Sequence, residues 1–401
     1  MELSVLAGRW KVRSSILVLV FSALALVYPI WKIFFDQHPE VDFRVFWFAG
    51  WMWNHGLDPY TSDFFELGNA SLPDGNRLYH WLYPPNWALI CSALAITDLQ
   101  TSLTVWRLVA TLFYIFGAVA LIMTLTREFT ASFRLMLASF GCAAVMWSDP
   151  VAVILSAGQV SPPFVYLGLA LIVCGYVDRK HWLLTAGLVF VALKPQIGAS
   201  LYIAFALVPE LRRSVVAAVL ISVLLALPQF LAHGPITSVL EWLGNLRVFN
   251  EVNSPLTLSG PGHLLARLNL PFPQFIQHLM VIVVGGIAGL LMRRDKGLAA
   301  LAFLFSGICA LVPLHNYDFA MLLPATVLAV CFLPARYGLA LIVAMLIFTL
   351  RPSSIESLSG MPVILGQSGG VMLMSVAALL LFALSIALLQ NNQRPFVPNP
   401  D

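Results

Sequence analysis

The chain has 401 residues, of which 60% are hydrophobic and 10% charged, and its formal net charge is +3. A soluble domain carries about 25% charged residues, so this composition excludes an ordinary water-soluble fold and indicates an all-α polytopic membrane protein. The five cysteines are odd in number and lie mostly in apolar runs, which indicates small core residues rather than a disulfide framework or a metal cluster.

The first apolar run, residues 15–35, is long enough to span a membrane and lacks a clear A-x-A cleavage site, so we expect no cleaved signal. A polar segment follows at residues 36–80 and carries seven acidic residues against two arginines. A loop this long, acidic and aromatic, directly after a membrane helix, predicts the lid and catalytic floor of an enzyme at the outer membrane surface.

Basic residues gather between the later apolar runs, and the positive-inside rule places these clusters in the cytoplasm. The chain must then cross the membrane an odd number of times between the first loop and Arg127. Residues 84–97 are too short to span about 30 Å as a helix, so we expect them to lie along the outer face while residues 101–125 cross. The first external loop is therefore predicted over residues 36–100.

With that choice the remaining apolar runs cross the membrane in alternating directions. The prediction is a single integral membrane domain, residues 1–401, with twelve spans and both termini inside. The predicted spans are 15–35, 101–125, 135–150, 162–177, 181–193, 196–209, 214–231, 275–292, 298–313, 319–334, 337–350 and 371–390. A second large external loop is predicted at residues 232–274. The shorter external turns are predicted at 149–161, 194–195, 314–318 and 351–370.

Several basic residues fall on the external side, against the positive-inside rule, which favours a role in binding an anionic group. They are Arg44, Arg77, Lys194, Arg247, Arg267 and Arg351. Lys194 is at the tip of a short out-and-back segment, so we expect it at headgroup depth, where a phosphate would meet it in a medium of low dielectric. The alternative is a helix-capping lysine that snorkels outward.

Other external tips carry polar side chains that can share one pocket. His315 and Asp318 are three residues apart at a predicted helix start, so both can face the same side. The alternative is that Asp318 caps that helix while His315 bonds a backbone carbonyl. Gln159 can contact a substrate or satisfy broken-helix backbone. Asp42 likewise has two interpretations, as a catalytic carboxylate or as the N-cap of a following helix.

These residues belong to an ordered set of short motifs. The motifs are V-D-F-R-V-F-W at 41–47, G-L-D-P-Y at 56–60, Y-P-P at 83–85, G-Q at 158–159, L-K-P-Q at 193–196 and H-N-Y-D at 315–318. From about residue 40 to residue 320 the chain resembles glycosyltransferase family 87, of the GT-C superfamily. The best-known members of that family are mycobacterial mannosyltransferases, and the superfamily takes sugar from a polyprenyl-phosphate carrier.

The resemblance implies a GT-C-like helix bundle with juxtamembrane helices in the first external loop. It also implies a location in the bacterial inner (plasma) membrane, with the active site on the external face. Asp42 is then the essential carboxylate, His315 lies near the donor phosphate and Lys194 lies in the same pocket. The further candidates for the substrate pocket are Gln159, Asp318, Tyr60 and Asp58. The implied partners are a polyprenyl-phosphate sugar, a lipid or glycan acceptor and membrane lipids, with no nucleic acid.

The chemistry of such a transfer can be argued separately. Transfer from a lipid-phosphate sugar expels a phosphate ester, a stable anion that needs no general acid, so one carboxylate can suffice as the base. Cationic groups must hold the leaving phosphate, and Arg44 and Lys194 lead the candidates. Asp42 and Arg44 are two positions apart, so both would face one cleft if that segment were extended or irregular. Asp42 alone is not a D-x-D metal motif, so we expect no cofactor, while a divalent metal stays open.

The prediction is an inverting glycosyltransferase that moves a hexose, mannose by the resemblance, from a polyprenyl-phosphate carrier to a lipid or glycan acceptor. Two other classes are kept as alternatives. A secondary transporter can have twelve spans, but it usually shows internal repeats and polar groups near the membrane midplane. A flippase or ligase for polyprenyl-linked glycans would also handle polyprenyl phosphate outside the membrane.

Overall fold

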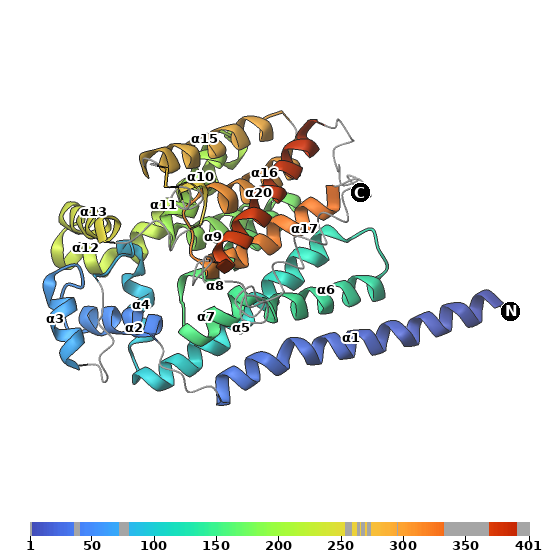
Figure 1. Ribbon diagram of the computed structural model, residues 1–401, viewed down its shortest axis with the longest axis horizontal. Helices are drawn as coiled ribbons and strands as arrows, with labels where there is room; N and C mark the ends of the chain where they lie inside the picture. The colour runs from blue at the N-terminus through green and yellow to red at the C-terminus, as the bar shows by residue number, and fades with distance from the viewer. Residues whose placement is uncertain are drawn as a thin grey trace.

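The structure is a computed structural model that describes residues 2–35, 41–71, 80–252, 259–262, 265, 269–270, 274–294, 296–332 and 369–390. Regular structure in these ranges is helical, and no strand occurs within them, as predicted for an all-α chain (Figure 1). The helices before residue 178 are α1 Glu2–Phe35, α2 Val41–Asn54, α3 Ser62–Ser71, η1 Pro85–Trp87, α4 Ala88–Leu94, α5 Leu99–Leu125, α6 Ala131–Met146, α7 Asp149–Ala157 and α8 Ser161–Val177. The later ones are α9 His181–Ala192, α10 Pro195–Ala206, η2 Pro209–Leu211, α11 Arg212–Leu225, α12 Leu227–His233, α13 Pro235–Val252, α15 Gln274–Met292, α16 Gly297–Leu311, η4 Asn316–Met321, α17 Leu322–Phe332 and α20 Gly369–Gln390.

Within the described ranges, α5 is the one unbroken helix that is both long and apolar enough to cross a membrane. Two bent pairs raise that number to three if each pair is a single span: α6 with α7, bent by 58°, and residues 209–225 with α12, bent by 56°. The other apolar helical segments recognised among the described residues have 10–17 residues, although three of them belong to longer helices, α1, α15 and α20. The predicted count of twelve spans is therefore not confirmed, and the span expected at 337–350 lies outside the described residues.

Proline accounts for the two bends. Pro150 stands in the first turn of α7, so the span expected at 135–150 ends at Met146 and the turn expected at 149–161 contains a helix. Pro228 stands in the first turn of α12 and divides the span expected at 214–231. Residues 84–97 form η1 and α4, which together are too short to span, as expected.

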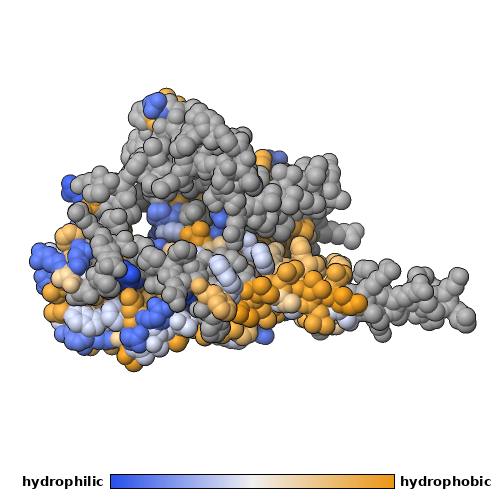
Figure 2. All heavy atoms as spheres, turned by 60° about the horizontal axis from the view of Figure 1, so that its bottom comes forward, coloured by the Kyte–Doolittle hydropathy of each residue, from blue (hydrophilic) through white to orange (hydrophobic). Residues whose placement is uncertain are grey.

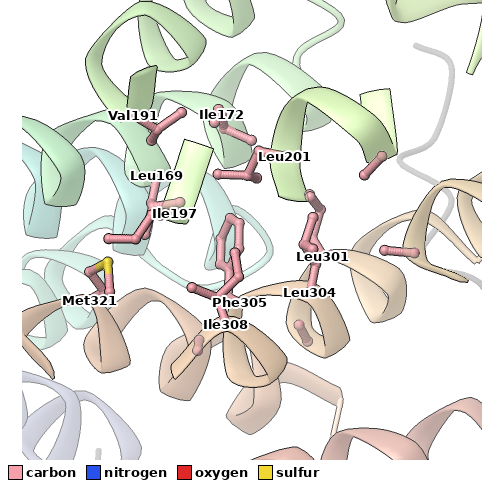
Figure 3. Close-up of a cluster of buried hydrophobic side chains, with 14 of the residues drawn as sticks. Leu169, Ile172, Val191, Ile197, Leu201, Leu301, Leu304, Phe305, Ile308 and Met321 are labelled. Carbon is pink, nitrogen blue, oxygen red and sulfur yellow. The ribbon is translucent and has the colours of Figure 1, made fainter. Parts of the chain in front are cut away.

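Buried apolar side chains join the helices of the middle and later part of the chain. Figure 3 shows the centre of this core, where α8, α9, α10, α16 and η4 meet. The labelled side chains are Leu169, Ile172, Val191, Ile197, Leu201, Leu301, Leu304, Phe305, Ile308 and Met321. A second buried cluster, rich in aromatic rings, joins α2, η1, α5 and α7.

Large apolar side chains are also exposed along α1, α5 and α6, among them Leu19, Val105, Phe116 and Phe140. Figure 2 shows hydrophobic residues gathered on this side of the molecule, and hydrophilic residues gathered toward the other end. Soluble monomers rarely expose apolar surface on this scale, whereas a lipid-facing side requires it. The fold is therefore consistent with a helical membrane protein.

Helices from the two predicted external loops pack together with α12, which ends the span predicted at 214–231, at the left end of Figure 1. We call α2, α3, α4, α12 and α13 the helical lobe. Trp242 of α13 donates from Nε1 to the Leu82 carbonyl at 3.0 Å. Asn245 of α13 donates from Nδ2 to the carbonyls of Tyr60 and Trp81, both at 3.2 Å. α13, from the loop predicted at 232–274, thus packs against the loop predicted at 36–100.

Candidate active site

Asp42 lies in the first turn of α2, where a carboxylate is favoured by the positive end of the helix dipole. Its side chain is partly buried, and this burial raises the pKa of Asp42 above its usual range. A hydrogen bond with the Gln159 side chain and the positive charge of Lys194 act in the opposite direction. Asp42 thus interacts with Gln159 and Lys194, which come from two distant parts of the chain.

The turn between α7 and α8 brings Gln159 against α2. Gly158 ends α7 in the left-handed conformation, with φ +70°, and its amide donates to the Ile154 carbonyl at 2.9 Å. A Cβ at Gly158 would lie 2.6 Å from Cβ of Phe43, the neighbour of Asp42, so the close approach of the turn to α2 requires glycine. Trp106 of α5 donates from Nε1 to the Gln159 carbonyl at 3.2 Å and holds the turn from the other side.

Arg107 of α5 fixes the end of α7 that precedes this turn. Its side chain is 1% exposed, Nε donates to the Leu155 carbonyl at 2.9 Å, and a second guanidinium nitrogen lies 3.4 Å from the Ser156 carbonyl. These carbonyls belong to the last turn of a helix and have no partner within it. Arg107 was not among the sequence-predicted residues, although a single arginine inside the apolar run 101–125 was a signal that could have identified it.

Lys194 is held in the turn between α9 and α10, where Pro195 begins α10. Trp87 of η1 donates from Nε1 to the carbonyl of Leu193 at 2.8 Å, which ties this turn to the first predicted external loop. The Lys194 side chain is 6% exposed and forms an ion pair with the Asp318 carboxylate, which is 1% exposed. The alternative of a lysine that snorkels outward is therefore wrong, because Lys194 points into the protein.

Asp318 joins this pair to the turn that carries His315. Its Oδ2 accepts a hydrogen bond from the His315 backbone amide at 3.1 Å, while Oδ1 faces Lys194 Nζ. Asp318 thus bonds the amide at the start of η4 and also pairs with Lys194, while the pocket that it would share with His315 stays a prediction. Leu314 is held in turn by Ser259, whose Oγ accepts from the Leu314 amide at 3.1 Å and whose own amide donates to the Leu314 carbonyl at 2.8 Å.

The His315 ring lies on Tyr317, with ring centroids 5.1 Å apart and an interplanar angle of 23°. Burial lowers the pKa of His315, and the Lys194 charge lowers it further, while Asp318 opposes both effects. His315 is therefore a neutral hydrogen-bonding group at neutral pH rather than a second cation. The Tyr317 ring lies under Lys194, with Nζ 5.4 Å from the ring centroid.

Tyr83 lies near this cluster and was not among the predicted site residues, although Y-P-P at 83–85 was one of the motifs. Its ring packs on Phe46, with centroids 4.4 Å apart, and its carbonyl accepts from the Tyr60 hydroxyl at 2.6 Å. Burial raises the pKa of Tyr83 far above its usual range, and the nearby carboxylates of Asp42 and Asp318 raise it further. The Tyr83 phenol consequently keeps its proton and can donate a hydrogen bond.

Two predicted pocket residues belong to a second network inside the helical lobe. The buried Asp58 accepts from the Tyr60 amide at 3.0 Å and from Gln229 Nε2 at 3.1 Å, and its Oδ2 lies 3.5 Å from His233 Nδ1. This network connects α12 to the G-L-D-P-Y segment. Asp58 and Tyr60 therefore hold the lobe together, and their contact with a substrate stays a prediction.

The remaining predicted cations lie elsewhere. Arg44 is buried in α2, and two positions on a helix are turned by roughly 200°, so Asp42 and Arg44 leave α2 on different sides. The shared cleft expected for an extended segment is therefore not formed, and a role for Arg44 in phosphate binding stays a prediction. Arg247 is exposed on α13, whereas Arg77, Arg267 and Arg351 lie outside the described residues. No group of three His, Cys, Asp or Glu side chains in the described ranges is placed to hold a metal ion.

One comparison with known proteins identifies a family. The family model of glycosyltransferase family 87 matches residues 81–324, which is more than half of the chain. No curated protein and no solved structure matches. The matched range contains Tyr83, Gln159, Lys194, His315 and Asp318, while α2 with Asp42 precedes it. The chain therefore belongs to glycosyltransferase family 87, and this membership implies that it is a glycosyltransferase.

Proposed function

We propose that the protein is an inverting glycosyltransferase that moves a hexose from a polyprenyl-phosphate carrier to a lipid or glycan acceptor. The observation that carries this proposal is that the charge of the buried Lys194 acts on the partly buried carboxylate of Asp42. Those two groups are the base and the phosphate-binding cation that the reaction needs.

In the proposed reaction the acceptor hydroxyl attacks the anomeric carbon of the sugar while the bond from that carbon to the phosphate oxygen breaks. Asp42 accepts the proton of the attacking hydroxyl. The raised pKa of Asp42 makes it a stronger base than an exposed carboxylate, provided that it is ionised. Because attack and departure take place on opposite sides of one carbon, the product has the inverted configuration.

The phosphate leaves with one more negative charge than it had in the donor. Lys194 is the cation placed to stabilise that charge, and its low exposure places the interaction in a medium of low dielectric. Asp318 keeps the lysine oriented before the substrate arrives, and the Tyr83 phenol and the neutral His315 supply hydrogen-bond donors beside it. A second carboxylate is present, but its engagement with Lys194 makes it unsuited to act as a nucleophile.

The lipid carrier and the membrane location rest on further support. The apolar surface over α1, α5 and α6 suits a protein that meets its donor within a bilayer. The positive-inside rule supports the external face of a bacterial inner membrane for the tips that carry Gln159, Lys194 and His315. Mannose is the first sugar to test, because the best-known members of the family are mannosyltransferases.

The test is Asp42→Asn, assayed in membranes supplied with radiolabelled polyprenyl-phosphate mannose, glucose or galactose. Loss of the base is expected to lower the transfer rate by about 10²–10⁴-fold. The matched control is Asp63→Asn, because Asp63 is exposed on α3, and it should transfer at the wild-type rate. Transfer near the wild-type rate by Asp42→Asn would remove Asp42 from this role. Failure of the wild type to use any of the three donors would overturn the proposed donor class.

A further inference from the structure

Gln159 has a buried oxygen that the protein itself does not use. The side chain is 4% exposed, and no hydrogen-bond partner for Oε1 exists among the described residues. A buried polar atom without a partner costs about 1–3 kcal/mol, so few are kept in folded proteins. This oxygen lies in the same side chain that bonds Asp42, and therefore at the proposed reaction centre.

The orientation of the amide follows from its partner. An ionised carboxylate only accepts hydrogen bonds, so Gln159 presents its NH₂ group to Asp42 and turns Oε1 away. The backbone around the side chain cannot relax to bury this oxygen elsewhere. The backbone amide of Gln159 donates to the Ile154 carbonyl at 3.1 Å, and its backbone carbonyl accepts from Trp106. The preceding residue, Gly158, is packed against Phe43.

The oxygen is suited to a neutral O–H donor. The acceptor hydroxyl has one proton, which goes to Asp42, so that hydroxyl cannot also donate to Gln159. A ring hydroxyl of the transferred sugar is the remaining group next to the reacting carbon, and hydrogen bonds to such hydroxyls strengthen as charge develops at that carbon. We propose that Gln159 is a sugar-binding residue whose Oε1 accepts a hydrogen bond from a ring hydroxyl of the transferred hexose. This inference rests on the proposed glycosyl transfer.

The test compares wild-type protein with Gln159→Leu, using the parent polyprenyl-phosphate hexose that the wild type accepts and its four monodeoxy analogues. Deoxygenation itself changes the reactivity of the sugar, so the measured quantity is the ratio of kcat/KM for parent and deoxy donor in each protein. For one analogue this ratio should fall by about 10-fold or more from wild type to Gln159→Leu. We expect that analogue to be the 2-deoxy donor. Coupling at position 2, 3 or 4 supports the proposal, whereas coupling at the exocyclic position 6 alone would contradict it.

Gln159→Glu separates the two functions of the side chain, because it keeps an oxygen for the sugar and loses the NH₂ group that bonds Asp42. This variant should keep the wild-type ratio of kcat/KM for parent and deoxy donor, while its kcat falls. The acid limb of its kcat/KM profile against pH should move to higher pH. Gln100→Leu is the matched control, since Gln100 is exposed on α5, and it should behave as wild type. Equal ratios in wild type and Gln159→Leu for all four analogues would overturn this inference and leave the proposed transfer intact. A wild type that uses no lipid-phosphate hexose would overturn both.

Discussion

Lys194 and Asp318 form a buried ion pair although 124 residues of sequence separate them. Removing two charges from water costs several kcal/mol per ion, and the attraction between them compensates only when the geometry is favourable. Here the Asp318 carboxylate also accepts the His315 amide, so one residue orients both the lysine and the imidazole. The pair thus keeps a cation in place beside Asp42 before any substrate binds, which lowers the reorganisation that the reaction requires.

Lys194→Met is expected to raise the KM for the lipid-phosphate donor and to lower stability. The stability loss should be about 3–5 kcal/mol, because Asp318 is left buried without its cation. The double variant Lys194→Met with Asp318→Leu should recover most of this stability without recovering donor binding. Thermal unfolding in detergent and donor kinetics measure the two effects separately.

Lys180→Met is the control for this pair, because the Lys180 side chain is 53% exposed. It should change neither the donor KM nor, beyond about 1 kcal/mol, the stability. A wild-type donor KM in Lys194→Met would show that the lysine does not hold the phosphate, whatever its effect on stability.

The pH dependence of transfer should follow the protonation of Asp42. Its pKa is raised by burial and lowered by Gln159 and Lys194, and the base is active only when ionised. Activity is therefore lost as the pH falls through the Asp42 pKa. Lys194→Met removes a charge that lowers this pKa, so the acid limb of kcat/KM should move to higher pH. An acid limb that stays in place or moves to lower pH would contradict the assignment of Asp42 as the base.

Sequence reasoning located the polar cluster because its members are exceptions to an apolar background. Gln159, Lys194, His315 and Asp318 each stand at a tip between hydrophobic runs, and the positive-inside rule placed these tips on one side. In the structure Asp318 pairs with Lys194 and accepts from the His315 amide, and both Gln159 and Lys194 act on the pKa of Asp42. The family match over residues 81–324 covers these four residues but not Asp42.

What sequence reasoning missed depends on where helices end and turn. Arg107, Trp87 and Trp106 each donate to a backbone carbonyl at a helix end, and such a partner cannot be assigned before the end is located. The prediction of a cleft shared by Asp42 and Arg44 assumed an extended segment and is wrong, because this segment is helical. The count of twelve spans assumed that each apolar run is one straight helix, whereas the helix starts at Pro150 and Pro228 divide two of those runs.

Gly158→Ala should impair both stability and transfer. Alanine at φ +70° costs about 1–2 kcal/mol, and its Cβ would overlap Phe43 Cβ, so the turn must move away from α2 and take Gln159 with it. A shift of about 1 Å at a reaction centre can lower a rate by about 10²-fold. Kinetics and thermal unfolding of the purified variant measure both losses.

Gly56→Ala is a closely matched control, because Gly56 has φ +71° and no atom lies within 4 Å of a Cβ built there. It should show the backbone cost with no change in kcat/KM. Equal effects of the two substitutions on kcat/KM would mean that the contact with Phe43 does not position Gln159.

Glu241→Gln should stabilise the helical lobe at neutral pH. Burial raises the pKa of Glu241 from its ordinary value of 4.5, the neighbouring Asp58 raises it further, and His233 partly opposes the shift. A carboxyl group with a raised pKa in the folded state contributes stability below its ordinary pKa, and loses that contribution as the pH rises through the raised value. The melting temperature of the wild type should therefore fall relative to that of Glu241→Gln as the pH rises from acidic to neutral.

Glu66→Gln is the control, because Glu66 is exposed on α3. The difference in melting temperature between this variant and the wild type should not vary with pH in this way. If the difference in melting temperature between wild type and Glu241→Gln is constant over this range, the pKa of Glu241 is not raised in the folded protein.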